Sequence, residues 1–260
     1  RMGGIDVPRV AEYTKHHKQD FLEWMDFQYD FSRIISIAGF KGPLNKAQQE
    51  GRASKALEYI FFTTLPATGE ASFNTTNVVG IDASTSSELT RAEVQGHKQA
   101  AQVVDLLQNE IPGFEQAFLI DTAVQIGVRE TRRAQSDYMM LGDDVRKQAR
   151  FEEPIARASY GIDIHDPEKG KSRLEHLQRG SYYEVPKGSL MVKNAENLMV
   201  AGRCIGATWE GHSALRVQPT SSATGEACGA IAALAVQNKQ TIREVPYPQI
   251  RERIRSNLED

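Results

Sequence analysis

Four polar side chains in the C-terminal part of the sequence have the types and spacing to do chemistry. Arg203, Glu210, His212 and Arg216 lie between a short apolar run at residues 198–201 and a stretch of small residues. His212 is the best candidate for a general acid or base, because imidazole titrates near neutral pH. Arg216 stays charged at any working pH and can hold a carboxylate or carbonyl by two contacts. The alternative is a hydrogen-bonded loop histidine, with Glu210 orienting it or solvated, and a surface Arg216 paired with an acidic neighbour.

A second concentration of charge places Arg129, Arg132 and Arg133 around Glu130. Alternate residues of an extended strand share a face, so Arg129, Thr131 and Arg133 would point the same way on a strand. A charged strand end at the surface accounts for the same pattern.

The small-residue stretch that follows Arg216 is expected to be a helix. Pro219 suits its first turn, because the N–H that proline lacks is unpaired there in any case. Hydroxyl groups follow at Thr220, Ser221 and Ser222. A helix N-terminus attracts negative charge through its free N–H groups and its dipole. Gly225 and Gly229 share a helical face although each costs about 1 kcal/mol relative to alanine, so we expect a ligand or a sheet to come close to this face.

Other residues that could bind metal give weaker patterns. Asp163, His165 and Asp166 fall within four residues, a spacing that a polar turn explains better than a metal site. Cys204 and Cys228 are far apart and form no C-x-x-C, so neither a zinc site nor a disulfide framework is indicated. We therefore expect no metal site.

The composition is that of an ordinary globular protein. The 260 residues are 40% hydrophobic and 25% charged, with a formal net charge of −3. This balance gives no reason to expect nucleic acid or an anionic membrane as a partner. No apolar run approaches the roughly 20 residues that span a bilayer. No signal-peptide pattern opens the chain, and the expected location is the cytoplasm.

The pattern of apolar and turn-forming residues predicts irregularly alternating helices and strands. Helices are expected over residues 13–29, from a capping box at 90–93 to 111, and over 143–150. Strands are expected over 33–38, in a hairpin of 58–64 and 71–81, over 117–140 as one strand or two, and over 155–164, 182–192 and 198–201. Residues 170–180 read as an exposed loop. The predicted fold class is α+β, with a mixed or antiparallel sheet.

Four segments together resemble a family of FAD-dependent oxidoreductases. They are VGIDA at 79–83, QIGVRETRR at 125–133, IDIH at 162–165, and AGR at 201–203 followed by RVQPT at 216–220. Their order and rough spacing agree with the family, so the resemblance covers nearly the whole chain.

The resemblance implies a substrate domain over residues 1–192, attached to part of an FAD-binding fold over residues 193–260. In this second part a strand, a polar loop and a helix would contact the flavin. The implied cofactor-binding residues are Gly202, Arg203, Gln218, Pro219, Thr220, Ser221, Ser222 and Gly225. The implied catalytic residues are Arg216, His212 and Arg129, with Arg129 holding an anionic or carbonyl substrate. The reaction would be hydride transfer between a small organic molecule and the flavin.

One feature of the family pattern is missing. Enzymes of this kind are expected to carry G-x-G-x-x-G after a strand, where glycines let the backbone approach the pyrophosphate, and the sequence has no such pattern. The chain resembles a C-terminal fragment whose partner would be an N-terminal dinucleotide-binding segment. We expect it to bind FAD weakly or not at all, and to be inactive alone. The alternative is a cofactor-free, non-catalytic fragment or interaction domain that keeps the fold.

Overall fold

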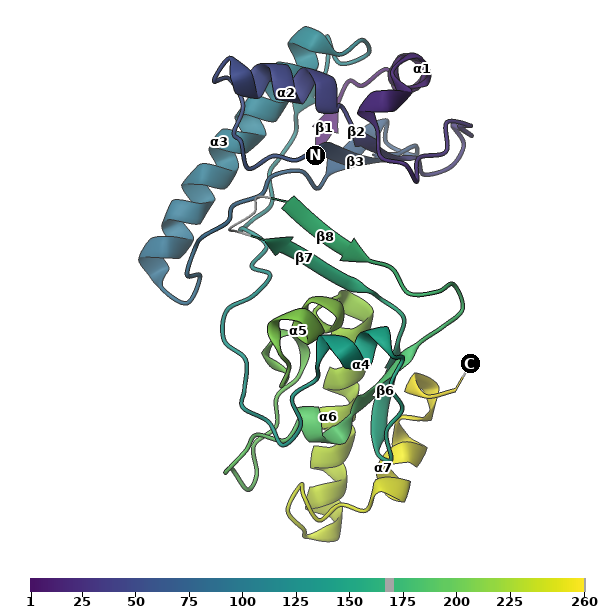
Figure 1. Cartoon of the computed structure of the whole chain (residues 1–260), viewed down its shortest axis with the longest axis vertical. Coiled ribbons are helices and arrows are strands. Elements are labelled where there is room, and N and C mark those ends of the chain that lie inside the picture. Colours follow the sequence, from purple (N-terminus) through teal and green to yellow (C-terminus); the bar gives the residue numbers. More distant parts are fainter. Residues whose placement is uncertain (167–170, 260) are drawn as a thin grey trace. The chain divides into compact units, whose positions relative to one another are not determined.

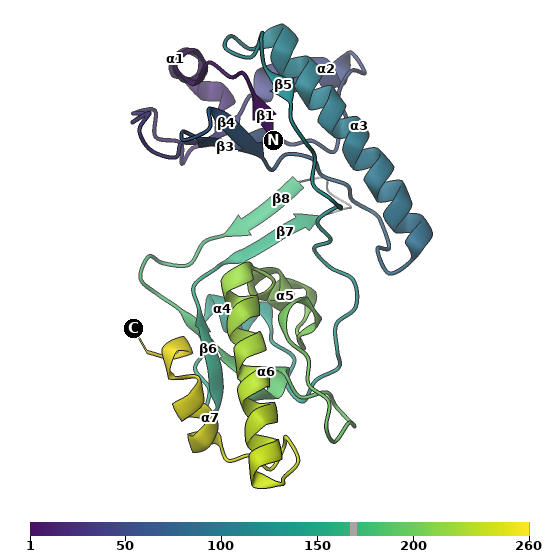
Figure 2. The same cartoon turned by 180° about the vertical axis from the view of Figure 1, so that it is seen from behind.

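The computed structural model describes residues 1–166 and 171–259, and the chain divides into two compact units. One unit is Arg1–Gly127 and the other is Val128–Asp260. Figures 1 and 2 show the elements of both units from opposite sides. Each unit combines helices with antiparallel strand pairs, which confirms the predicted α+β class. The predicted division into a substrate domain over residues 1–192 and part of an FAD-binding fold over residues 193–260 stays a prediction.

The first unit is built on a five-stranded sheet in the order β2-β3-β4-β1-β5. The strands are β1 (Met2–Gly3), β2 (Ser36–Gly39), β3 (Ile60–Leu65), β4 (Glu70–Phe73) and β5 (Phe118–Leu119). The helices are α1 (Val7–His16), α2 (Lys41–Gln49) and α3 (Ser86–Glu110), with a 3₁₀ turn η1 at Lys18–Asp20. The hairpin predicted around residues 66–69 is confirmed as β3 and β4, although β4 ends at Phe73 and not at residue 81, and the predicted strand before it is confirmed as β2.

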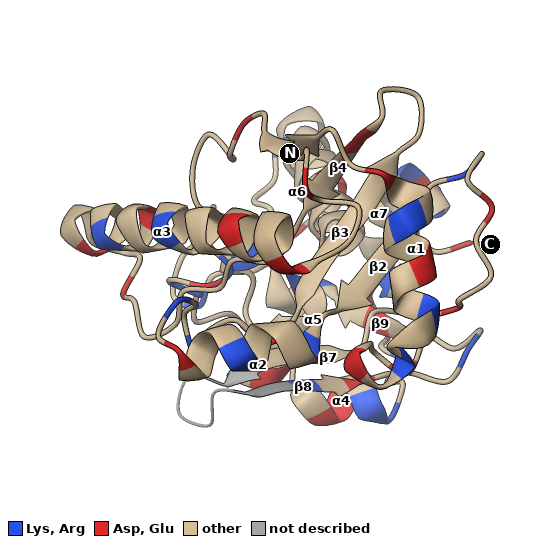
Figure 3. Cartoon of the chain, turned by 90° about the horizontal axis from the view of Figure 1, so that it is seen from above, with Lys and Arg blue, Asp and Glu red and all other residues tan. Residues whose placement is uncertain are grey.

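Aromatic side chains hold the core of this unit. Phe40, Phe62 and Phe114 are fully buried, and the ring centroid of Phe62 lies 6.2 Å from that of Phe40 and 5.7 Å from that of Phe114. Every second residue of β3 is buried, as the period of a strand requires. Helix α3 buries one side and carries acidic and basic residues on the rest of its surface (Figure 3).

The second unit contains two separate strand pairs and a C-terminal group of helices. Its strands are β6 (Pro154–Ala158), β7 (Ile162–Asp166), β8 (Lys171–Glu175) and β9 (Tyr183–Pro186), paired as β6 with β9 and β7 with β8. Its α-helices are α4 (Gly142–Arg146), α5 (Trp209–Leu215), α6 (Gln218–Asn238) and α7 (Tyr247–Arg253). Short 3₁₀ turns lie at η2 (Lys187–Ser189), η3 (Gly202–Cys204) and η4 (Arg255–Asn257).

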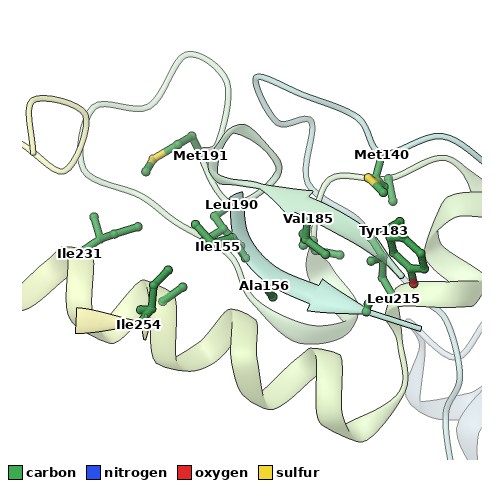
Figure 4. Close-up of a cluster of buried hydrophobic side chains, with 14 of the residues drawn as sticks. Met140, Ile155, Ala156, Tyr183, Val185, Leu190, Met191, Leu215, Ile231 and Ile254 are labelled. Carbon is green, nitrogen blue, oxygen red and sulfur yellow. The ribbon is translucent and has the colours of Figure 1, made fainter. Parts of the chain in front are cut away.

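The core of the second unit lies between the β6–β9 pair and helices α6 and α7. Ile155 and Val185 of the strands and Ile231 of α6 are fully buried there (Figure 4). Tyr183 is also fully buried, and its hydroxyl donates to the carbonyl oxygen of Ala214 at 3.2 Å. This bond joins the core to α5. Helix α6 packs against the β6–β9 pair with the face that carries Ala227 and Ile231.

Two helix predictions in the first unit are wrong in their bounds. The helix predicted over residues 13–29 is instead α1, which begins at Val7 because Asp6 caps it by accepting from the N–H of Arg9 at 3.2 Å. The later apolar residues run along the sheet, where the N–H of Leu22 donates to the carbonyl of Ala38. The capping box at 90–93 lies inside α3, which begins at Ser86 with Thr85 as its cap.

The strand predicted over residues 117–140 is reduced to β5 and two isolated bridges. Beyond Leu119 the backbone is held by single contacts, such as the bond from Ala134 N–H to the carbonyl of Cys204, and not by a ladder. Arg129, Thr131 and Arg133 therefore do not share a strand face. The predicted run 155–164 is divided into β6 and β7, and 182–192 contains β9.

Three further predictions in the second unit are corrected. The run 198–201 forms one bridge, between Met191 and Met199, and no regular strand. The expected polar loop after it contains η3 and α5. The expected loop at 170–180 contains β8, whose charged Arg173 and Glu175 form ion pairs. Residue 170, where that prediction begins, lies outside the described residues.

Helix α5 is seated against the backbone just before α4. A β-carbon at Gly211 would clash with the carbonyl oxygen of Met140, and one at Gly142 would clash with the side chain of Glu210. Only glycine allows this approach. Thr208 then caps α5 by accepting from the N–H of Gly211 at 3.4 Å, and its own N–H donates to Met140.

We expect Gly211→Ala to lower the free energy of unfolding by about 1–3 kcal/mol, because the added methyl group must push α5 away from Met140. Urea unfolding followed by circular dichroism measures the change. The matched control is Gly229→Ala in α6, where a β-carbon has nothing within 4 Å. This control should leave stability unchanged or raise it by up to about 1 kcal/mol. Equal effects of the two substitutions would contradict the close contact.

Candidate active site

Helix α5 carries His212 into the interior of the second unit. The imidazole is fully buried, and its Nε2 lies 3.1 Å from the carbonyl oxygen of Arg203. Its Nδ1 lies 3.9 Å from Oε2 of Glu130 and has no hydrogen-bond partner among the described residues. Burial lowers the pKa of His212 to about 4, and the charges of Arg133, Arg216 and Arg203 act in the same direction.

The ring of His212 is therefore neutral at neutral pH, with Nε2–H donating to Arg203 and Nδ1 left as an acceptor. The one N–H of a neutral imidazole is far too weak an acid to be given up at neutral pH, so the ring cannot serve as a general acid. It retains only the capacity of a base, at Nδ1. The geometry also agrees with the alternative of a structural, hydrogen-bonded histidine.

Arg216 ends α5 and reaches strand β7. Its guanidinium Nη2 donates to the carbonyl oxygen of Asp163 at 2.7 Å and lies 3.8 Å from the carboxylate oxygen Oδ2 of the same residue. Only 10% of the Arg216 side chain is exposed. Burial lowers the pKa of Arg216, and the charge of Arg129 lowers it further.

Asp163 connects Arg216 with two other groups. Nη1 of Arg129 lies 4.0 Å from its Oδ2, and the hydroxyl of Tyr160 donates to Oδ2 at 3.0 Å. Burial and the neighbouring carboxylate raise the pKa of Tyr160 to about 12. The structure thus brings Arg129 and Arg216 to one carboxylate, although they are far apart in sequence.

Four arginines share this neighbourhood, and we call them the arginine cluster: Arg129, Arg133, Arg203 and Arg216. Among the described side chains, the carboxylates that face them are Glu130, whose Oε1 lies 3.0 Å from Arg133 Nη1, and Asp163. The four positive charges exceed the two negative charges of this described set, which favours an additional anion.

The start of α6 adjoins this cluster. Val217 precedes the helix without a side-chain cap, and Pro219 stands in the first turn as predicted. Gly202 has φ of +63°, a conformation that favours glycine, and its N–H donates to the hydroxyl of Thr224 at 3.0 Å. This bond fixes the turn that contains Arg203 against α6. Around the helix start, Gln218, Pro219 and Ser222 are exposed, Ser221 is half-buried, and Thr220 is buried.

The sequence model of the family described as FAD dependent oxidoreductase matches residues 1–254. The chain belongs to this family. No curated protein and no solved structure gives a significant match. None of the described helices is long and apolar enough to cross a membrane.

In this member of the FAD-dependent oxidoreductases, the two glycines of α6 lie on an open surface. Both are exposed, and a β-carbon at Gly225 or Gly229 would have nothing within 4 Å. The opposite face, with Ala227 and Ile231, packs into the core. Within the described chain, therefore, no sheet makes the close approach that the glycines predict. That face remains open to a ligand.

Glu210 does not orient His212 in this flavoprotein family member. Its carboxylate is bound by Arg146 of α4, with Nη2 at 2.9 Å, and by Arg173 of β8 at 3.0 Å. Arg146 also pairs with Glu175 at 2.8 Å. Hydrogen bonds from Arg146 and Arg173 lower the pKa of Glu175 to about 2. The ion pairs join α4, α5 and β8, so Glu210 positions the helix and not the imidazole.

Sequence reasoning missed two residues of the site. The sequence places Asp163 in a polar turn and in the IDIH segment without giving it a role, and Tyr160 belongs to no motif. His165 and Asp166, the other residues of the weak metal pattern, have side chains outside the described residues. The one available signal was the alternation in IDIH, which places Asp163 on the opposite side of a strand from the buried Ile162 and Ile164.

The buried neutral state of His212 predicts a pH dependence of stability. The unfolded state binds a proton below a pKa of about 6.5, whereas the folded state does so only near 4, so stability falls as the pH is lowered between these values. We expect this residue to contribute up to about 3 kcal/mol to the loss. His212→Gln, which keeps a donor for Arg203, should show a smaller loss between pH 6.5 and 4 in urea titrations. The same pH slope in both proteins would show that His212 is not neutral and buried.

Proposed function

We propose that this chain provides the substrate-binding part and one wall of the flavin site of an oxidoreductase that transfers a hydride between a small organic molecule and FAD. Membership of the family supports FAD as the cofactor. The observation that carries the proposal is the arginine cluster beside the uncapped start of α6, because it joins fixed positive charge to free backbone donors.

The residues around the start of α6 fit a flavin. Gly202, Arg203, Gln218, Pro219, Thr220, Ser221, Ser222 and Gly225 would form its wall. When bound, FAD supplies a ring system that accepts or returns a hydride at N5. The helix start would stabilise negative charge on that ring without any group that must titrate. The open face at Gly225 leaves room for a planar group against the helix backbone.

Arg216 and Arg129 would bind the substrate. Arg216 is held from behind by its bond to the Asp163 carbonyl, while Arg129 is more than half exposed and can adjust. Asp163 keeps the two guanidinium groups near each other without forming a close ion pair with either. Such a pair suits a carboxylate or a carbonyl oxygen. His212 would take a proton at Nδ1, since it is neutral at working pH.

The remaining contacts to FAD would come from elsewhere. The sequence contains no G-x-G-x-x-G turn for the pyrophosphate. We propose that a dinucleotide-binding segment outside these residues supplies it, with residues 1–192 serving the substrate and 193–260 the flavin. The missing turn also favours a second candidate, a cofactor-free interaction domain that uses the exposed face of α6. Titration with FAD separates the two.

The first prediction of this proposal concerns affinity. At micromolar concentration the 260-residue chain should not retain FAD stoichiometrically, because several contacts worth about 1–3 kcal/mol each are missing. Weak, saturable quenching of flavin fluorescence should still be measurable. Gly225→Leu should weaken it at least about tenfold by blocking the open face, since the new side chain meets nothing in the chain itself.

The matched control for Gly225→Leu is Ala232→Leu, on the same exposed face but two turns further from the helix start. It should leave FAD binding unchanged. Stoichiometric FAD in the purified chain would contradict the need for a further segment. Complete absence of saturable binding, or equal effects of the two leucines, would favour the cofactor-free alternative.

The second prediction concerns Arg216. In the chain joined to the proposed dinucleotide-binding segment and loaded with FAD, Arg216→Lys should slow substrate-driven flavin reduction about 100-fold, or about 2.7 kcal/mol of lost transition-state stabilisation, because lysine cannot make the two-point contact. A screen of small carboxylates and carbonyl compounds supplies the substrate, and stopped-flow absorbance measures the rate. Arg132→Lys is the control, since Arg132 is exposed and lies in the run 129–133 without belonging to the arginine cluster. Reduction of the Arg216 variant at the wild-type rate would remove Arg216 from the site.

A further inference from the structure

The first unit contains a pocket of about 160 Å³ between α3 and one end of the five-stranded sheet. An apolar cavity of about 150 Å³ is large enough for benzene, so the volume corresponds to a single ring. None of the residues proposed for the flavin or its substrate lines this pocket. All of its lining residues belong to the unit Arg1–Gly127.

The inner surface of the pocket is apolar. Met2 of β1 and Val103 of α3 are buried beneath it, and Ile126 closes one side. Phe73 of β4 and Leu119 of β5 complete the apolar lining. Leu119 remains 45% exposed, as both residues of the edge strand β5 are exposed. An apolar ring bound here would cover surface that is now in water.

Two side chains of α3, one turn apart, build the opposite wall. The carboxylate oxygen Oε1 of Glu93 accepts from the N–H of Ile126, and Nε2 of His97 lies 3.2 Å from the hydroxyl of Thr122. Nδ1 of His97 faces the carbonyl oxygen of Glu93 at 2.8 Å, so it carries the ring proton and Nε2 accepts from Thr122. These bonds hold residues 122–126 beside the helix and keep the pocket open.

Gly96 lies on α3 between these two residues and provides the space. A β-carbon there would meet only Cδ1 of Ile126, at 3.8 Å, which is ordinary contact. Neither the packing nor the backbone conformation at residue 96 requires glycine. Glycine is nevertheless unfavourable inside a helix, so its presence here needs another explanation. What the missing side chain provides is the volume of the pocket.

We propose that this pocket binds a small uncharged aromatic molecule that carries one O–H or N–H donor. The ring would lie on the apolar lining, and the donor would reach the Glu93 carboxylate, whose Oε2 lies 4.0 Å from His97 Nδ1, beyond hydrogen-bond distance. An anion would be repelled by the Glu93 carboxylate, because Arg1, the cation at the rim, is already paired with Asp121 at 2.9 Å. A cation would lose its hydration against the apolar lining.

The test uses 4-fluorophenol and ¹⁹F NMR with the whole chain. We expect saturable broadening of the fluorine signal, at least tenfold weaker binding of fluorobenzene, which lacks the donor, and no binding of 4-fluorobenzoate. Gly96→Leu should reduce the affinity for 4-fluorophenol at least tenfold, because its side chain fills the pocket. Gly96→Ala should have an intermediate effect.

The matched control is Gly229→Leu, the same substitution on an exposed helical face of the other unit, which should bind 4-fluorophenol as the unchanged chain does. Circular dichroism of each variant verifies that α3 is intact. Unchanged binding in Gly96→Leu, absence of binding by the unchanged chain, or equal binding of fluorobenzoate would each overturn the proposal. None of these results depends on FAD, so failure here leaves the proposed oxidoreductase function standing.

Discussion

The seating of α5 on the backbone of residues 140–142 is the contact on which the second unit depends. Gly211 and Gly142 let the helix approach until Thr208 N–H bonds to Met140, and no side chain larger than hydrogen fits at either glycine. From this seat, His212 points into the core and Arg216 reaches β7. The helix then turns directly into α6. A shift of α5 by the width of one methyl group would move the imidazole, the guanidinium and the start of α6 together.

Burial affects the charges of His212 and Arg216 differently. The pKa of His212 falls to about 4, so the ring loses its charge, whereas the guanidinium of Arg216 is a far weaker acid and remains charged although burial lowers its pKa too. At an effective dielectric constant of about 20, two unit charges 4 Å apart interact by about 4 kcal/mol. Asp163 lies near this distance from both Arg129 and Arg216, so it offsets part of their mutual repulsion. A second carboxylate would offset more of it. The site therefore combines permanent positive charge with a neutral base.

The parts of the fold that follow from local sequence were predictable, and those set by distant contacts were not. The turn at residues 66–69 defined the β3–β4 hairpin, and Pro219 marked the start of α6. The spacing of Phe21, Trp24 and Met25 is helical, yet Phe21 and Met25 are buried beside the sheet, because aromatic packing outweighed periodicity. Arg216 was predictable as a charged residue before a helix. Its partner Asp163 lies 53 residues away, and no local pattern specifies such a pairing.

The glycines of α6 connect stability with the proposed function. Two glycines inside one helix cost about 2 kcal/mol relative to alanine, a considerable part of a typical stability of 5–15 kcal/mol. Close packing compensates for glycine at Gly211, where the helix gains a backbone contact. At Gly225 and Gly229 the described chain provides no such gain, because nothing lies within 4 Å of either β-carbon position. The helix core, with Thr224, Ala227 and Ile231, would be preserved if both positions were alanine. Under the proposed function, a planar cofactor lying against this exposed face of α6 would offset the cost, because it would gain from the absence of both side chains.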